Sequence, residues 1–322
     1  GSLSAGVDNG DGTWTLTPSD LNGLQIMPPS DYSGSFDLTV TASTTESDGD
    51  TASTTSSFTV TVSGVADTPA LTVSDASGVE DAPIALSIGS ALADTDGSES
   101  LSVVVGGVPT GASLSAGVNN GDGTWTLTPS DLDGLTVTPP SNYSGSFDLT
   151  VTAISAEADG DTVTTNATIT VDVSGVADAP SLAVQHASGA EDTPIGLDIA
   201  PALSDTDGSE TLSVVVGGVP TGATLSAGTD NGDGTWTLTP ADLDGLTVTP
   251  PSNFSGSFDL SVTAISAEAD GDTAASTATI TVDVSGVADA PTLTASDVSG
   301  AEDTAIGLDI SAALTDTDGS ET

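Results

Sequence analysis

The stretch SGSFDLSVTA at residues 255–264 alternates apolar and polar side chains along its length. Its apolar residues, from Phe258 to Ala264, are separated by single Asp, Ser or Thr residues. Because successive side chains of a β-strand point to opposite faces of a sheet, this period predicts a strand with one buried and one solvated face. Runs of the same period at residues 195–199 and 280–284 predict further strands around the same core.

The same stretch recurs at a fixed interval. SGSFDLTV stands at residues 33–40 and 144–151, and the three tryptophans, Trp14, Trp125 and Trp236, keep the same spacing, since 125 − 14 = 236 − 125 = 111. No insertion breaks this register, and the interval is about the size of one β-sandwich. The sequence therefore predicts an all-β tandem array, in which each domain of about 111 residues is a two-sheet sandwich of seven or eight short strands.

The segments SGVADTPAL, SGVADAPSL and SGVADAPTL mark the boundaries between repeats, near Val65, Val176 and Val287. The Pro in each segment restricts the residue before it to extended geometry, which predicts a short, stiff linker. The resulting division comprises the C-terminal part of a repeat at 1–66, complete repeats at 67–177 and 178–288, and the N-terminal part of a repeat at 289–322.

The chain is strongly acidic. It holds 47 Asp and Glu residues, one His and no Lys or Arg, for a formal charge of -47. Two unit charges about 4 Å apart repel by roughly 4 kcal/mol at an effective dielectric constant of 20, so clustered carboxylates need positive charge from outside the protein. We expect no binding to nucleic acid and no membrane insertion, because phosphate groups are bound by basic side chains and no long apolar run is present.

Acidic residues recur at the same positions in successive repeats. DTDGSE occupies residues 94–99, 205–210 and 316–321. Calcium takes six to eight hard oxygen ligands, including carboxylates and backbone carbonyls, and tolerates irregular geometry. The chain has no cysteine, so disulfides cannot reinforce its small aliphatic cores. The recurring carboxylates predict bound Ca2+ in that stabilising role.

The motifs together resemble cadherin-like tandem repeats of bacterial surface proteins, including the extender regions of giant RTX-type adhesins. The resemblance covers the whole chain and rests on the motifs AEDTPI, DTDG, PPSNYSG, ADGDT and GVADAP. It implies an Ig/cadherin-like fold for each domain, with calcium at the junctions between domains. Each junction would combine an acidic pair and a late loop of one domain, the linker Asp, and the Asp-x-Asp turn of the next.

Carried onto this chain, the resemblance implies two sets of calcium ligands. The first junction would use Glu80, Glu157, Asp159, Asp178, Asp205 and Asp207, and the second Glu191, Glu268, Asp270, Asp289, Asp316 and Asp318. The linker VADAP contains fewer Asp and Asn residues than the linkers of classical cadherins. We therefore expect fewer calcium ions at each junction.

These features favour a structural function. We expect extender repeats of a secreted or cell-surface bacterial adhesin, forming a calcium-rigidified extracellular rod or filament shaft, whose partners are neighbouring repeats and, in a filament, identical chains. Two alternatives stay open. In one, residues 289–322 of one molecule complete residues 1–66 of the next in a head-to-tail matrix fibre or sheath; in the other, each repeat binds carbohydrate or protein. We expect no enzyme, since no assembly of acid, base and nucleophile is visible.

Other motifs favour structural explanations. DNGDGTW at 8–14 and 230–236 lacks the ligand spacing of an EF-hand, and its Asn-Gly and Asp-Gly pairs predict a hairpin turn. The tryptophans alternate with Leu and are expected in the core. His186 aligns with Asp75 and Asp297, which predicts an exposed position that tolerates substitution.

Overall fold

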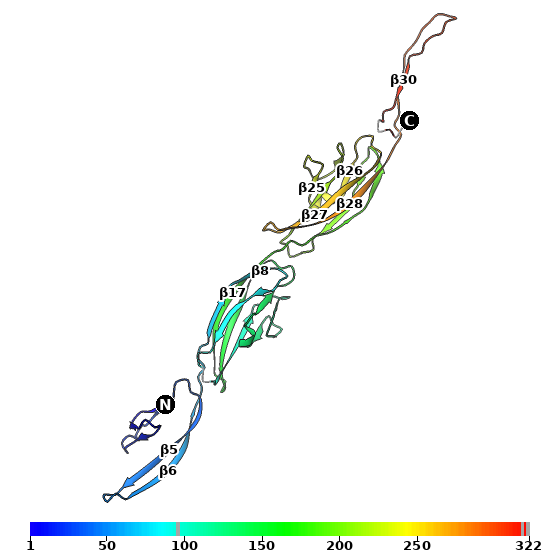
Figure 1. Cartoon of the computed structure of the whole chain (residues 1–322). Coiled ribbons are helices and arrows are strands. Elements are labelled where there is room, and N and C mark those ends of the chain that lie inside the picture. The colour runs from blue at the N-terminus through cyan, green and yellow to red at the C-terminus, as the bar shows by residue number, and fades with distance from the viewer. Residues whose placement is uncertain (95–96, 317–318, 320–322) are drawn as a thin grey trace. The chain divides into compact units, whose positions relative to one another are not determined.

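The computed structural model describes residues 1–94, 97–316 and 319 (Figure 1). The chain forms two compact units, Gly1–Ser174 and Gly175–Thr322. Each unit holds one complete sequence repeat and one partial repeat, and the division falls just before the expected boundary at 177/178. None of the helical segments among the described residues is long and apolar enough to span a bilayer.

The described residues of the complete repeat in the first unit form eleven strands and one 3-10 turn. In chain order they are β7 (Ala70–Ser74), β8 (Ala76–Val79), β9 (Ile84–Ala85), β10 (Ser87–Ala91), β11 (Glu99–Gly106), β12 (Ser113–Leu114), β13 (Val118–Asn119), β14 (Trp125–Leu127), η1 (Pro129–Asp131), β15 (Thr136–Thr138), β16 (Gly145–Glu157) and β17 (Thr162–Ser174). The count exceeds the expected seven or eight because several strands are only two or three residues long.

Two layers make up the sandwich. The larger sheet has the strand order β13-β14-β11-β16-β17-β8, in which β8 runs parallel to β17 and the other neighbours are antiparallel. The opposite layer contains the three-stranded sheet β12-β15-β9 and the pair β10-β7. The backbone N–H of Leu86 donates to the carbonyl of Leu135, which extends the contact between β9 and β15.

The core lies between the layers, as the alternating pattern predicts. The larger sheet contributes the buried side chains of Val103, Val105, Leu149, Val151, Ile169 and Val171, and the smaller one those of Ile84, Leu114 and Val137. Each such side chain stabilises the fold by about 1.5–3 kcal/mol relative to full exposure. Trp125 is half-buried and packs against this core, with Tyr143 and Phe147.

The complete repeat of the second unit has the same order of elements. They are β18 (Ser181–Val184), β19 (Ala187–Ala190), β20 (Ile195–Gly196), β21 (Ile199–Ala202), β22 (Thr211–Gly217), β23 (Thr224–Leu225), β24 (Thr229–Asp230), β25 (Trp236–Leu238), η2 (Pro240–Leu243), β26 (Thr247–Thr249), β27 (Gly256–Ala267) and β28 (Thr273–Ser285). Its larger sheet has the order β19-β28-β27-β22-β25-β24, and its core repeats that of the first unit.

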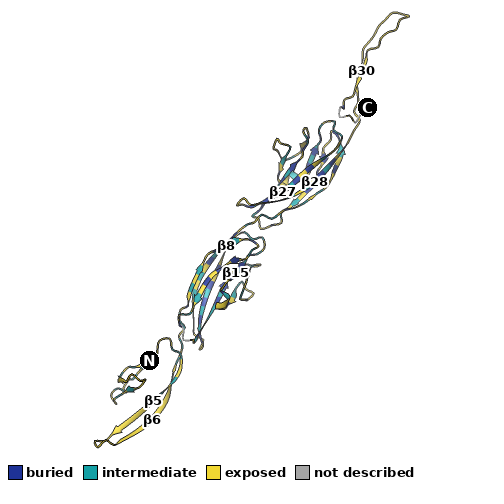
Figure 2. Cartoon of the chain, in the orientation of Figure 1, coloured by how far each residue is buried: buried dark blue, intermediate teal, exposed yellow. Residues whose placement is uncertain are grey.

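The partial repeats form fewer contacts. Residues 1–66 contain β1 (Ser2–Leu3), β2 (Val7–Asp8), β3 (Trp14–Thr15), β4 (Ile26–Met27), β5 (Gly34–Thr45) and β6 (Thr51–Val62), and residues 289–322 contain β29 (Thr292–Ala295) and β30 (Ile310–Ala313). Figure 2 shows the β5–β6 hairpin largely exposed, whereas β27 and β28 carry buried residues. Phe58 of β6 is 54% exposed, although the equivalent Ile169 in the complete repeat is fully buried.

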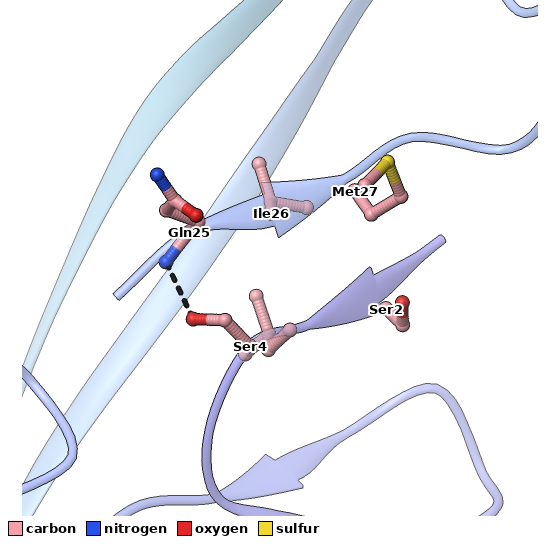
Figure 3. Close-up of a pocket in the computed structure, with 6 residues that line it drawn as sticks. Ser2, Ser4, Gln25, Ile26 and Met27 are labelled. Carbon is pink, nitrogen blue, oxygen red and sulfur yellow. Dashed lines mark hydrogen bonds between the residues drawn. The ribbon is translucent and has the colours of Figure 1, made fainter. Parts of the chain in front are cut away.

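An open hollow lies beside β1 and β4 in the first partial repeat (Figure 3). It is lined by residues 2–4 and 25–27, and the backbone N–H of Gln25 donates to Ser4 Oγ at 2.9 Å. In the complete repeat of the same unit, the equivalent of β4 is β15, which also pairs with β9. The hollow therefore marks a sheet edge that a complete repeat covers.

Candidate metal centre

We call the end of a complete repeat at which β16 finishes and β17 begins the entry pole, because the preceding linker enters there. The exit pole is the opposite end, where β17 finishes. In the second unit, β27 and β28 define the two poles in the same way. Since β17 and β28 each have 13 residues and strands rise about 3.3 Å per residue, the two poles of a repeat lie roughly 40 Å apart.

Two glutamates from neighbouring strands lie side by side at the first entry pole. Glu99 opens β11 and Glu157 closes β16, and the two residues are direct cross-strand partners. Both side chains are buried, at 8% and 7% exposure. Like charges directly opposite on a sheet repel, so this pair destabilises the metal-free sheet unless a proton or a cation compensates.

The linker is held by these acidic side chains through its backbone. The N–H of Asp67 donates to Glu99 Oε1 at 2.6 Å, and the N–H of Ala66 donates to Asp161 Oδ2 at 2.9 Å. A Cβ on Gly64 would overlap the carboxyl group of Glu157. The linker therefore approaches the pole at a distance that only a glycine permits. The entry pole is thus a linker-binding site as well as an acidic cluster.

The second unit repeats this arrangement. Asp178 N–H donates to Glu210 Oε1 at 2.7 Å, Ala177 N–H donates to Asp272 Oδ2 at 3.1 Å, and Gly175 lies against the carboxyl group of Glu268. The hydroxyl of Ser266 in β27 donates to the carbonyl of Asp178 at 2.5 Å. Independent repetition of the same contacts indicates that the repeated sequence, not its neighbours, creates the site.

The Asp-x-Asp turn, Asp205 to Asp207, also lies at the entry pole of the second unit. Asp205 is 1% exposed, and one of its carboxylate oxygens lies within 4.8 Å of one from Glu268. Ser209 Oγ lies within hydrogen-bond distance of both carboxylates, 3.2 Å from Asp205 Oδ2 and 3.1 Å from Glu268 Oε1, and its single hydrogen can be donated to either. Asp207 is exposed, and its Oδ1 accepts the N–H of Ser209 at 2.7 Å. In the first unit, Asp94 is likewise buried.

Burial raises the pKa of Glu157 and of Glu268 above the ordinary value of 4.5. The Ser98 and Ser209 hydroxyls oppose this rise, whereas the neighbouring carboxylates of Glu99 and Glu210 add to it. A raised carboxyl pKa means that the site disfavours the charged carboxylate unless a proton or a cation neutralises it.

The exit poles carry the acidic pairs that precede β9 and β20. Glu80 N–H donates to the carbonyl of Ser174, and Glu191 N–H to that of Ser285, both at 3.0 Å. These contacts fix the two glutamates beside the last residues of β17 and β28. Glu191 Oε1 accepts the N–H of Val287 in the following linker at 2.5 Å.

The structure places two members of each expected ligand set at the opposite end of the repeat from the acidic pair. Glu157 and Asp159 lie at the opposite pole from Glu80, and Glu268 and Asp270 lie at the opposite pole from Glu191. The late loop belongs to the entry pole of its own repeat, because it joins the end of β16 to the start of β17. One ion therefore cannot contact Glu80 and Glu157 of the same repeat.

The remaining expected ligands lie as follows. Asp178, Asp205 and Asp207 gather at the entry pole of the second unit. Asp289 is exposed in the last linker and Asp316 is 3% exposed, whereas Asp318 lies outside the described residues. Asp159 and Asp270 are exposed, and each accepts a backbone N–H within its own turn.

Among the described residues, four acidic residues outside the expected sets accept hydrogen bonds from linker N–H groups: Glu99, Asp161, Glu210 and Asp272. Glu99 and Glu210 belong to the repeated DTDGSE motif, so their recurrence was visible in the sequence. Their proximity to Glu157 and Glu268 was not visible, because it depends on how β11 and β22 are placed within the sheets.

The acidic poles fit a hard divalent cation. Glu99 Oε2 and Glu210 Oε2 at the entry poles, and Glu191 Oε2 at an exit pole, are buried with no hydrogen-bond partner. A buried carboxylate oxygen without a partner is costly, and the chain has no Lys or Arg to neutralise it. Carboxylate and carbonyl oxygens are the ligands that calcium prefers.

No protein-family model and no curated protein matches the chain. Among solved structures, protocadherin gamma B2 extracellular cadherin domains 3–6 are 15% identical with a TM-score of 0.35, covering 80% of this chain and 59% of that one. Mouse cadherin-23 EC22–24 is 16% identical with a TM-score of 0.37, covering 78% of this chain and 74% of that one. The chain thus spans less than two thirds of the protocadherin structure.

Human mucin-like protocadherin EC1–2 is 14% identical with a TM-score of 0.36, covering 68% of this chain and 98% of that one. The description of the complete repeats as β-sandwiches rests on the strand order and the buried core described above.

Proposed function

We propose that the chain consists of extender repeats of a secreted or cell-surface bacterial adhesin of the RTX type, without enzymatic activity. In this function, Ca2+ bound at the poles holds the linkers straight, so that the array forms a stiff extracellular rod. The repeats transmit force and set distance, and any ligand-binding tip lies elsewhere in the protein.

The observation that carries the proposal is the glutamate pair of each entry pole. In both units one glutamate holds the N–H of the linker Asp through Oε1, while its Oε2 is buried without a hydrogen-bond partner. A cation that neutralises this pair strengthens the site that grips the linker. Ordering of the linker and binding of the metal are then thermodynamically coupled.

The residues that would hold calcium at the entry pole of the second unit are Asp178, Asp205, Asp207, Glu210 and Glu268. When bound, the ion supplies the positive charge that the sequence omits. Extracellular calcium modules bind at about 0.1–1 mM, and a ligand at 100 times its dissociation constant stabilises the bound state by about 2.7 kcal/mol. That is enough to change a linker from mobile to mostly ordered.

Small-angle scattering of the whole chain, with millimolar calcium and then with a chelator, tests this function. We expect a larger maximum dimension with calcium and a shorter, more variable particle without it. A double variant, Glu99→Gln with Glu210→Gln, should resemble the chelated protein even in calcium. Asp122→Asn with Asp233→Asn removes the same charge at two exposed hairpins and should behave as the wild type.

Identical scattering with and without calcium would contradict the proposal. A particle mass that grows with protein concentration would favour the head-to-tail fibre subunit. The exposed apolar side chains of residues 1–66, such as Phe58, would then meet those of residues 289–322, such as Leu308, in a second molecule.

A further inference from the structure

One position in the exit pole differs between repeats in a way that bears on the linker. Residue 253 is Asn in the motif PPSNF, whereas the equivalent residue 31 is Asp in PPSDY. The two backbones are nearly the same there, with φ of 60° at Asn253 and 59° at Asp31. Asn and Asp both tolerate this left-handed conformation, so the exchange changes the side chain's chemistry and not the loop.

Asn253 connects three parts of the second unit. Its backbone N–H donates to Asp192 Oδ1 at 3.1 Å, which ties it to the acidic pair of the exit pole. Its side-chain Nδ2 donates to Asp289 Oδ2 at 3.3 Å and to the carbonyl of Thr315 at 3.4 Å. The amide thus joins the linker Asp and the loop after β30 through donors that only an amide offers.

An Asp at this position cannot make the same contacts. An ionised carboxylate only accepts hydrogen bonds, so it would face Asp289 with a second negative charge. Asp67 follows Asp31 by the same 36 residues that separate Asp289 from Asn253. The equivalent pair in the first unit therefore consists of two carboxylates.

A second observation indicates that this pole takes a cation as well. Glu191 is 4% exposed, its Oε1 accepts the linker N–H of Val287, and its Oε2 is buried without a hydrogen-bond partner. The pole of the second unit therefore combines one group that needs a positive charge with one amide that holds the linker without it.

We infer that the residue at this position sets how strongly each linker depends on calcium. Asn253 keeps the linker at Asp289 partly ordered without metal, whereas Asp31 leaves the linker at Asp67 dependent on the cation. The calcium-dependent part of this inference rests on the proposed function. Successive junctions of one array would then stiffen at different calcium concentrations, although their repeats are almost identical.

Hydrogen exchange of the full chain, measured by mass spectrometry in chelator and across a calcium titration, tests the inference. With Asn253→Asp we expect several-fold faster exchange of residues 287–289 in chelator, and recovery at saturating calcium with a midpoint raised several-fold. Asp31→Asn should slow exchange of residues 64–67 in chelator. Both substitutions copy a residue that another repeat carries at the same place, so the fold is expected to survive.

Asn119→Asp is the matched control. Its equivalents are Asp8 and Asp230, and in all three hairpins the side-chain Oδ1 accepts a backbone N–H at 2.8–2.9 Å. This variant adds the same charge and should leave both linkers unchanged. Unchanged exchange at 287–289 in chelator for Asn253→Asp would overturn the inference.

The two proposals fail separately. If calcium alters no linker in the wild type, the proposed function is wrong, while the chelator arm still decides whether Asn253 holds the linker. If calcium orders the wild-type linkers but Asn253→Asp matches the wild type throughout, the inference alone is wrong.

Discussion

Two sets of carboxylates recur in both complete repeats of this chain, and their surroundings differ. In the hairpins, Asp122 and Asp233 are exposed. Each carboxylate accepts two hydrogen bonds from the Thr two residues later, one from its hydroxyl and one from its backbone N–H. At the entry poles, Glu99 and Glu210 are buried, and each has one oxygen without a partner. Recurrence alone therefore does not identify a metal ligand; burial without a hydrogen-bond donor separates the two sets.

The largest expected effect is on calcium binding. Glu99→Gln with Glu157→Gln removes both charges of the glutamate pair at one entry pole, so calorimetry should detect the loss of the ions bound there. Mutating even the outer partners of metal ligands costs about 10–100-fold in affinity, so losing two candidate ligands should cost at least that much. Asp122→Asn with Asp131→Asn removes the same charge from an exposed hairpin and a half-buried turn, and should leave the binding isotherm unaltered. An equal loss of calcium affinity in both variants would contradict the assignment of the ions to the entry pole.

The close approach of the linker gives the next effect. Gly175→Ala should displace the Glu268 side chain, because the added Cβ would overlap that carboxyl group. We expect a several-fold weaker calcium affinity and faster hydrogen exchange at residues 177–178. Gly196→Ala is the control, since a Cβ there meets no atom within 4 Å. The prediction fails if both variants bind calcium as the wild type does.

In the metal-free chain, acidification should affect the hairpin residues Asp122 and Asp233 and the entry-pole residues Glu157 and Glu268 in opposite directions. Hydrogen bonds from Thr124 and Thr235 lower the pKa of Asp122 and Asp233 below 3.8, so the stability they provide is present above that pH and is lost as the pH falls through the lowered pKa. Burial raises the pKa of Glu157 and Glu268 above 4.5, so the associated stability is present below pH 4.5 and is lost as the pH rises through the raised pKa.

Carboxyl-carbon NMR titration of the chelated protein measures this contrast directly. Midpoints above 4.5 for both glutamates and below 3.8 for both aspartates are expected. If all four residues titrated at their ordinary values, burial and hydrogen bonding would not distinguish the poles from the hairpins.

The smallest effect concerns one hairpin. Thr124→Val removes the hydroxyl that donates to Asp122 at 2.6 Å but keeps the backbone N–H at 3.1 Å. The pKa of Asp122 should rise toward its ordinary value, while calcium affinity stays unchanged. NMR titration and calorimetry of the same sample check both halves. A change in calcium affinity would show that the hairpin belongs to the metal site.

His186 illustrates what a sequence alignment leaves out. The side chain is exposed, as its alignment with Asp75 predicted. Yet the position is not simply permissive: Thr281 N–H donates to His186 Nδ1 at 3.0 Å, and Thr170 N–H donates to Asp75 Oδ1 at 2.9 Å. Both residues are acceptors for the same backbone group of the strand beside them. This shared contact explains why two chemically different residues occupy the position.

Much of the fold followed from the sequence. The period of two in Phe258–Ala264 reappears as β27, with Leu260, Val262 and Ala264 fully buried, and the DNGDG segments form the predicted turns between β2 and β3 and between β24 and β25. Such features are local, because side-chain alternation and positive backbone angles are properties of neighbouring residues.

The sequence by itself determined the repeat period, the all-β class and the need for external positive charge, because composition and spacing are read without knowing the fold. Only the tertiary structure decided which acidic residues share a pole. The 13 residues of β17 separate Glu157 from Glu80, and cross-strand pairing brings Glu157 beside Glu99, which lies in a strand much earlier in the chain. Proximity in a sheet depends on strand order and register, and neither can be read from the spacing of residues along one chain.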